Sequence, residues 1–260
     1  MKRFWNGCMI AFSLFTRLPV PQIEWKDENL KYVFCFYPVI GAVIGGLSFF
    51  VFWLLQSVLA ADKFLTAAIL AVLPVLVTGG IHLDGFCDVS DAIASRQPME
   101  RKLEILKDSN AGAFAVIQTV LYFVMYVALL YALPAFLQPL YCLGFSFIRS
   151  LAGLAILCLK PARPNGMLRS LTDPAKKGAC LFFLVFFALL SVGASVWLEW
   201  KTALCAVCGV SLFTLYYKGM CRRHFGGITG DTSGWLIQTS ELLYLGILVG
   251  AERIFTAVGL

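Results

Sequence analysis

Seven long apolar runs set the strongest limit on how this chain can fold. They lie at about 33–59, 64–80, 113–133, 140–159, 179–197, 202–217 and 233–250. A membrane-spanning helix needs about 20 mostly apolar residues, and these runs lack the alternation expected of membrane strands. Only 14% of the 260 residues are charged, against about a quarter in soluble proteins. We therefore predict an all-α, polytopic membrane helix bundle with about seven transmembrane helices.

The basic residues are distributed unevenly between the loops that join these runs. Of the 21 Lys and Arg, 17 lie in the N-terminal region and the loops at 81–112, 160–177 and 218–231. Only Lys63, Lys201 and Arg253 lie on the opposite side, and Arg149 lies within a span. Cytoplasmic loops carry the excess of Lys and Arg, so we expect a cytoplasmic N-terminus and an external C-terminus in a cell inner membrane. Because topology accounts for the net charge of +6, we expect no nucleic-acid partner.

A polar segment at 79–112 interrupts the apolar pattern and carries six acidic residues. Asp84, Asp88 and Asp91 follow one another at i, i+4 and i+7, which places all three carboxylates on one face of a helix. Like charges so close repel, and Mg²⁺ removes such repulsion while it bridges carboxylates to substrate phosphates. We favour this metal interpretation over a solvated loop face.

Three further polar clusters share the predicted cytoplasmic side, at 107–112, 162–166 and 225–232. Together they offer acidic groups for metal, basic groups for phosphate and a glycine-rich loop whose amides can approach an anion, as phosphoryl transfer requires. Their candidate residues are Lys107, Asp108, Arg163, Gly226, Gly227, Gly230 and Asp231. Asp108 has an equally good alternative as a charge at the N-terminus of the 113–133 helix. For Arg163 the alternative is a role as a topology anchor. For the glycines it is a tight turn, although the adjacent Asp231 favours a functional loop.

Polar groups inside the predicted spans are further candidates. A charge near the bilayer centre is costly unless it faces the bundle interior or water, so Arg149 and Glu241 are either functional residues or a structural pair. His82 precedes Asp84 by two positions and is a candidate general base, a support for the aspartates or a passive residue.

Taken together, these motifs resemble the cobalamin synthase family, the adenosylcobinamide-GDP ribazoletransferases. The similar segments are FTRLPVP at 15–21, FYPVIG at 36–41, GGIHLDGFCDVSD at 79–91, 101–112, ARP at 162–164 and GGITGD at 226–231. Two positions depart from the family pattern, because Ala92 stands where glycine is usual and Gln238 where glutamate is common. Glu241 keeps the second glutamate position.

The resemblance implies a single integral-membrane transferase domain over 1–260 that acts in cobalamin biosynthesis. The implied reaction joins α-ribazole, or its 5′-phosphate, to adenosylcobinamide-GDP and releases GMP, with Mg²⁺ as cofactor. The lipid bilayer and other cobalamin-assembly enzymes are expected partners. We expect catalytic roles for His82, Asp84 and Arg163, substrate binding by Lys107, Arg149, Gly226, Gly227, Gly230 and Glu241, and metal binding by Asp84, Asp88, Asp91, Asp108 and Asp231.

Two other classes of protein remain as alternatives. Another Mg²⁺-dependent membrane transferase, of the CDP-alcohol phosphotransferase or prenyltransferase type, would need aspartate motifs that differ from those at 84–91. A transporter would need ionisable residues along a pathway at the midplane, whereas the acidic residues here gather on one side. The preference for ribazole or its phosphate, the number of Mg²⁺ ions, the general base and the oligomeric state stay open.

Overall fold

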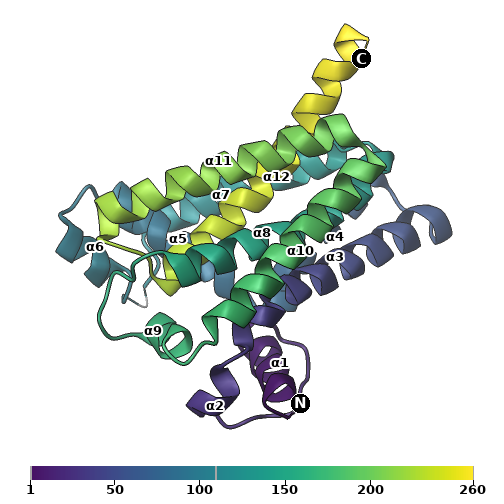
Figure 1. The fold of residues 1–260 in the computed structure, drawn as a ribbon. Helices are drawn as coiled ribbons and strands as arrows, with labels where there is room; N and C mark the ends of the chain where they lie inside the picture. Colours follow the sequence, from purple (N-terminus) through teal and green to yellow (C-terminus); the bar gives the residue numbers. More distant parts are fainter. Residues whose placement is uncertain (1, 109, 260) are drawn as a thin grey trace.

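The computed structural model describes residues 2–108 and 110–259, and helices make up most of this part of the chain (Figure 1). The α-helices are α1 (Lys2–Phe15), α2 (Asp27–Leu30), α3 (Tyr37–Trp53), α4 (Lys63–Thr78), α5 (Ile81–Ala94), α6 (Met99–Ile105), α7 (Ala113–Ala132), α8 (Gln138–Cys158), α9 (Met167–Thr172), α10 (Lys177–Leu198), α11 (Trp200–Phe225) and α12 (Gly230–Val258). Short turns of other helix types lie at η1 (Val33–Phe36), η2 (Leu54–Val58) and η3 (Ala135–Leu137). The predicted all-α class is confirmed.

Several of these helices have the length and composition of membrane spans. Five helical segments of the described chain qualify, and they contain α3, α7, α8, α10 and α11. The pair α4 and α5 qualifies together as a sixth, although the chain bends by 97° between them. The 29-residue α12 is not among them. The multi-pass bundle is therefore confirmed, and a seventh span at α12 stays a prediction.

The central helix of the bundle is α8, which packs against α3, α10 and α12. Its close approach to α3 depends on two glycines at GxxxG spacing. A Cβ at Gly41 would collide with the backbone of Phe145, and one at Gly45 would collide with that of Cys142. Gly46 faces open space, so only two of the three glycines in this segment serve the helix contact.

Two consecutive glycines produce the sharp bend between α4 and α5. Gly79 and Gly80 have φ angles of 65° and 81°, which lie in the left-handed region that glycine adopts without steric cost. The backbone N–H of Arg17 donates to the Val77 carbonyl at 2.8 Å, so the N-terminal segment fixes the end of α4. The bend turns α5, with its aspartates, away from the direction of α4.

The short helices gather away from the C-terminal end of α12. In Figure 1, α1, α2 and α9 lie at the bottom of the view and α6 at the left, whereas the C-terminus projects from the top. Among these short helices, α6 packs against α5 and α11, and α9 packs against α8.

Candidate active site

A cleft of about 390 Å³ brings together residues from α5, α9, α12 and the segment between α8 and α9. Five of the predicted site residues line it: His82, Asp84, Arg163, Gly230 and Asp231. Apolar side chains including Phe15, Phe34, Tyr37, Ile156 and Leu171 form much of the remaining wall. We call this the acidic cleft, after Asp84 and Asp231.

The acidic cleft exists because α5 and α12 cross at very close range. A Cβ at Gly85 would lie 2.8 Å from the Cα of Asp231, and one at Gly234 would lie 2.8 Å from the His82 carbonyl oxygen. Real Cβ contacts are not this short, so both positions need glycine. Two aspartates from distant parts of the sequence thereby reach the same cleft.

Arg163 comes to this cleft through a backbone link between the third and fourth sequence clusters. Pro161 and Ile228 form an isolated parallel bridge. The N–H of Ala162 donates to the Ile228 carbonyl at 2.8 Å, and the N–H of Ile228 donates to the Lys160 carbonyl at 2.9 Å. The Arg163 side chain is half-buried and donates from Nη2 to the carbonyl of Leu103, which directs its guanidinium beside α6.

The glycine-rich loop at 226–230 has a structural explanation at each of its first two glycines. Gly226 ends α11 in the left-handed conformation, with φ of 72°. Gly227 leaves no room for a Cβ against the backbone of Pro161. Gly230 is exposed, lines the acidic cleft and begins α12. Of the three, only Gly230 lines the acidic cleft, whereas Gly226 and Gly227 line a separate cavity of about 340 Å³.

The first turn of α12 is held by a capping box that the sequence reasoning missed. The Thr229 hydroxyl accepts from the Thr232 N–H at 3.1 Å, and the Thr232 hydroxyl accepts from the Thr229 N–H at 2.8 Å. The Thr229 hydroxyl also donates to Asp231 Oδ2 at 3.3 Å. The usual signal is Ser or Thr followed three residues later by Glu or Gln, and here a threonine fills that last position.

His82 is buried between aromatic rings in the wall of the cleft. Its ring centroid lies 6.1 Å from those of Phe15 and Tyr37, and only 4% of the residue is exposed. Among the described residues, its Nε2 has no hydrogen-bond partner. This burial is typical of a residue that shapes the wall, and it gives His82 less access to a substrate than Asp84 or Asp231.

The remaining predicted metal residues lie outside the acidic cleft. Asp88 follows Asp84 one turn along α5. Its carboxyl group interacts electrostatically with those of Asp84, Asp91 and Asp231. Asp91 contacts the N-terminus of α7, since its carboxylate accepts from the N–H groups of Gly112 and Ala115 at 2.6 and 2.9 Å. Within residues 2–108 and 110–259, no three His, Cys, Asp or Glu side chains form a ready-made metal cluster.

Asp108 and Lys107 are exposed in the turn after α6. Asp108 Oδ1 accepts from the backbone N–H of Asn110 at 3.0 Å and from its side chain at 2.9 Å. These two hydrogen bonds lower the pKa of Asp108. The sequence reasoning expected Asp108 either at a metal or at the α7 N-terminus, and it is Asp91 that occupies the second of these positions. Ser109, in the same cluster, lies outside the described residues.

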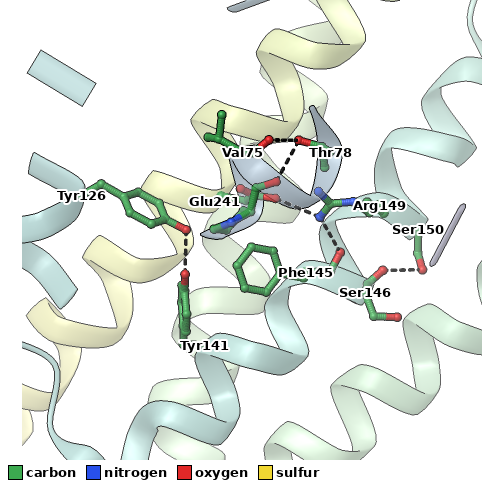
Figure 2. Close-up of polar contacts among 10 residues, drawn as sticks. Val75, Thr78, Tyr126, Tyr141, Phe145, Ser146, Arg149, Ser150 and Glu241 are labelled. Atoms are coloured by element: carbon green, nitrogen blue, oxygen red, sulfur yellow. Dashed lines mark hydrogen bonds and ion pairs between the residues drawn. The ribbon is translucent and has the colours of Figure 1, made fainter. Parts of the chain in front are cut away.

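Arg149 and Glu241 form a buried ion pair in the centre of the bundle. Figure 2 shows Arg149 reaching from α8 to Glu241 on α12, with Nη1 at 2.9 Å from Oε1. The same Nη1 donates to the Phe145 carbonyl at 3.3 Å. Their side chains are 1% and 3% exposed, so neither reaches the acidic cleft directly. The sequence left open whether these residues are functional or a pair, and the structure pairs them.

Comparison with known proteins agrees with this arrangement of motifs. The family model for cobalamin-5-phosphate synthase matches residues 7–249. The chain belongs to the cobalamin-5-phosphate synthase family. It is 36% identical to the adenosylcobinamide-GDP ribazoletransferase of Lachnoclostridium phytofermentans, over 92% of this chain and 91% of that one. It is 37% identical to the adenosylcobinamide-GDP ribazoletransferase of Halalkalibacterium halodurans, over 95% of this chain and 97% of that one. No solved structure is significantly similar to it.

The family membership confirms the resemblance read from the sequence motifs. The chain is a transferase of cobalamin biosynthesis with several membrane helices. The alternatives of a different membrane transferase and of a transporter are therefore set aside.

Proposed function

We propose that this chain joins α-ribazole, or its 5′-phosphate, to adenosylcobinamide-GDP and releases GMP at the cytoplasmic face of the inner membrane. The observation that carries the proposal is the acidic cleft, because it unites Asp84, Asp231 and Arg163 in a member of the cobalamin-5-phosphate synthase family. Carboxylates and a guanidinium around one cavity are the groups that phosphoryl transfer uses. The uneven distribution of Lys and Arg supports the cytoplasmic orientation.

The chemistry of the donors supports Mg²⁺ as the cofactor. Asp84 is exposed and Asp231 half-buried in the cleft, and the close approach at Gly85 brings their two helices together. Mg²⁺ commonly takes one or two carboxylates and completes its coordination with water and substrate phosphates, so a cluster of three protein ligands is not needed. Asp84 and Asp231 would hold the ion, which would supply positive charge for the pyrophosphate and the leaving GMP.

The side chains of the cleft have distinct tasks in this reaction. A ribose hydroxyl of ribazole attacks the phosphate attached to the cobinamide, the bond from that phosphate to GMP breaks, and the hydroxyl proton passes to a base. His82 has little access to this proton, because it is buried between Phe15 and Tyr37. Arg163 donates to phosphate oxygens and stabilises the charge that develops on them.

A direct assay tests the proposed function. The purified full-length protein in lipid nanodiscs is incubated with adenosylcobinamide-GDP, α-ribazole and Mg²⁺, and both the corrinoid product and GMP are quantified. We expect equal amounts of the two products from the wild type and a large loss with Asp84→Asn, whose side chain has the same shape without the charge. GMP release without incorporation of ribazole would contradict the proposed transfer.

A further inference from the structure

A second cleft, of about 450 Å³, adjoins the acidic cleft and shares Arg163 and Arg169 with it. Its other charged residues are Lys160, Lys177 and Asp173. We call it the basic cleft, because four of its five charged residues are basic. The two neighbouring clefts therefore differ in charge, and Arg163 lines both of them.

The positive charge of the basic cleft is largely uncompensated. Asp173 pairs with Arg169, with 3.2 Å between Oδ2 and Nε. Among the described residues, neither Lys160 nor Lys177 has an ion-pair partner within 4.0 Å. Lys177 is also the first residue of the 22-residue α10, whose N-terminal dipole adds to the attraction for an anion. A cavity of this size suits a small-molecule ligand, and its charge requires that the ligand be an anion.

Lys176 provides a comparison within the same segment. Its Nζ lies over the ring of Tyr32, 5.9 Å from the centroid, and its backbone N–H donates to the Lys31 carbonyl at 2.9 Å. Lys176 does not line the basic cleft, whereas Lys177 does. Both lysines belong to the basic 160–177 loop that indicated the topology, and the structure gives them different surroundings.

We propose that the basic cleft binds the guanylate phosphate of the nucleotide-activated substrate through Lys160, Lys177 and Arg169. This inference rests on the proposed function, and it gives each substrate its own subsite. The nucleotide end occupies the basic cleft, the ribazole hydroxyl enters the acidic cleft, and Arg163 reaches the phosphate at which transfer occurs. Lys160, Lys177 and Arg169 thereby hold the guanylate phosphate, while the phosphate that is transferred faces Asp84 and Asp231.

Binding of GMP itself tests the assignment without turnover. Isothermal titration calorimetry uses the full-length protein in phosphatidylcholine nanodiscs at low salt. We expect Lys160→Gln and Lys177→Gln each to raise the Kd for GMP about threefold to tenfold, and Lys176→Gln to change it less than about twofold. The two cleft variants should also raise KM for adenosylcobinamide-GDP and leave KM for α-ribazole unchanged. Equal effects at Lys176 and Lys177, or no GMP binding by the wild type, would overturn the proposal.

A lipid phosphate is the other anion with suitable chemistry, and a change of lipid distinguishes it. We expect a change from phosphatidylcholine to phosphatidylglycerol nanodiscs to raise the Kd for GMP by the same factor in the wild type and in both cleft variants. Weakening in the wild type that is absent from Lys160→Gln and Lys177→Gln would show that a lipid headgroup occupies the cleft, and the proposal would fail. A wild type that binds GMP through these lysines yet transfers no ribazole would contradict the proposed function and leave the nucleotide cleft supported.

Discussion

The carboxylate of Asp91 accepts a hydrogen bond from the backbone N–H of Gly112, with 2.6 Å between Oδ2 and the nitrogen. Its other oxygen accepts from the N–H of Ala115. The first N–H groups of a helix have no partner within the helix, so Asp91 on α5 satisfies two of them on α7. This contact joins the helix that carries the aspartates to the adjacent membrane helix.

The first prediction concerns this contact. Asp91→Asn keeps one acceptor but loses the charge, and it should destabilise the protein by about 1–2 kcal/mol. Turnover at low temperature should remain, with an unchanged dependence on Mg²⁺. Thermal unfolding in detergent measures the change, with Asp108→Asn as the control, since within the described part of the chain the Asp108 side chain hydrogen-bonds only to Asn110 in its own turn. A shift in the Mg²⁺ dependence of Asp91→Asn would instead make Asp91 a metal ligand.

The second prediction concerns the ion pair between Arg149 and Glu241. Replacement of one partner leaves a buried charge without compensation, which costs about 3–5 kcal/mol. Arg149→Met and Glu241→Leu should therefore each be strongly destabilised, and the double variant should be less destabilised than the sum of the two. A double-mutant cycle on thermal unfolding measures this coupling. Additive effects would show that the pair contributes nothing as a pair.

The third prediction concerns the crossing of α5 and α12. Gly85→Ala places a Cβ against the Asp231 backbone, so it should separate the two helices, cost about 1–3 kcal/mol and lower turnover. Gly219→Ala in α11 is the matched control, because a Cβ there meets no atom of the described chain within 4 Å. Similar behaviour of the two variants in unfolding and turnover assays would refute the importance of this crossing.

The fourth prediction concerns Arg163. Arg163→Lys keeps the charge but cannot form two parallel hydrogen bonds to phosphate, and turnover should fall about tenfold. Lys107→Gln should have little effect, because Lys107 is exposed and does not line either cleft. Steady-state measurement of GMP release compares them. If the loss at Lys107 exceeds that at Arg163, the phosphate contact has been assigned to the wrong residue.

Local sequence patterns were sufficient for much of the fold. The apolar runs predicted the helices, and the spacing of Asp84, Asp88 and Asp91 predicted a helix where α5 occurs. The GxxxG spacing in α3 is compatible with a close helix contact, but spacing alone does not say which partner a glycine faces. Gly41 and Gly45 face α8, and Gly46 faces nothing.

The site itself depends on contacts between distant segments, which the sequence does not encode locally. Arg163 reaches the cleft through the bridge between Pro161 and Ile228, and Asp231 reaches it through the glycine crossing at Gly85. Asp91, and not Asp108, contacts the N-terminus of α7. Both residues precede this helix in the sequence, and only tertiary packing selects one of them. For Arg149 and Glu241, the cost of a buried charge indicated that the two residues are either functional or paired with each other. Only the three-dimensional arrangement shows the pair.

The central claim is that Asp84 and Asp231 form a Mg²⁺-dependent phosphate site, and turnover measured against Mg²⁺ concentration tests it most directly. The assay follows GMP release by the wild type, Asp84→Asn and Asp231→Asn, with His82→Asn as the comparison in the same cleft wall. We expect a loss of about 100-fold for each aspartate variant at low Mg²⁺, with partial recovery as Mg²⁺ rises. His82→Asn should lose less and show no recovery. Near-normal turnover of both aspartate variants at low Mg²⁺ would show that these carboxylates do not form the metal site.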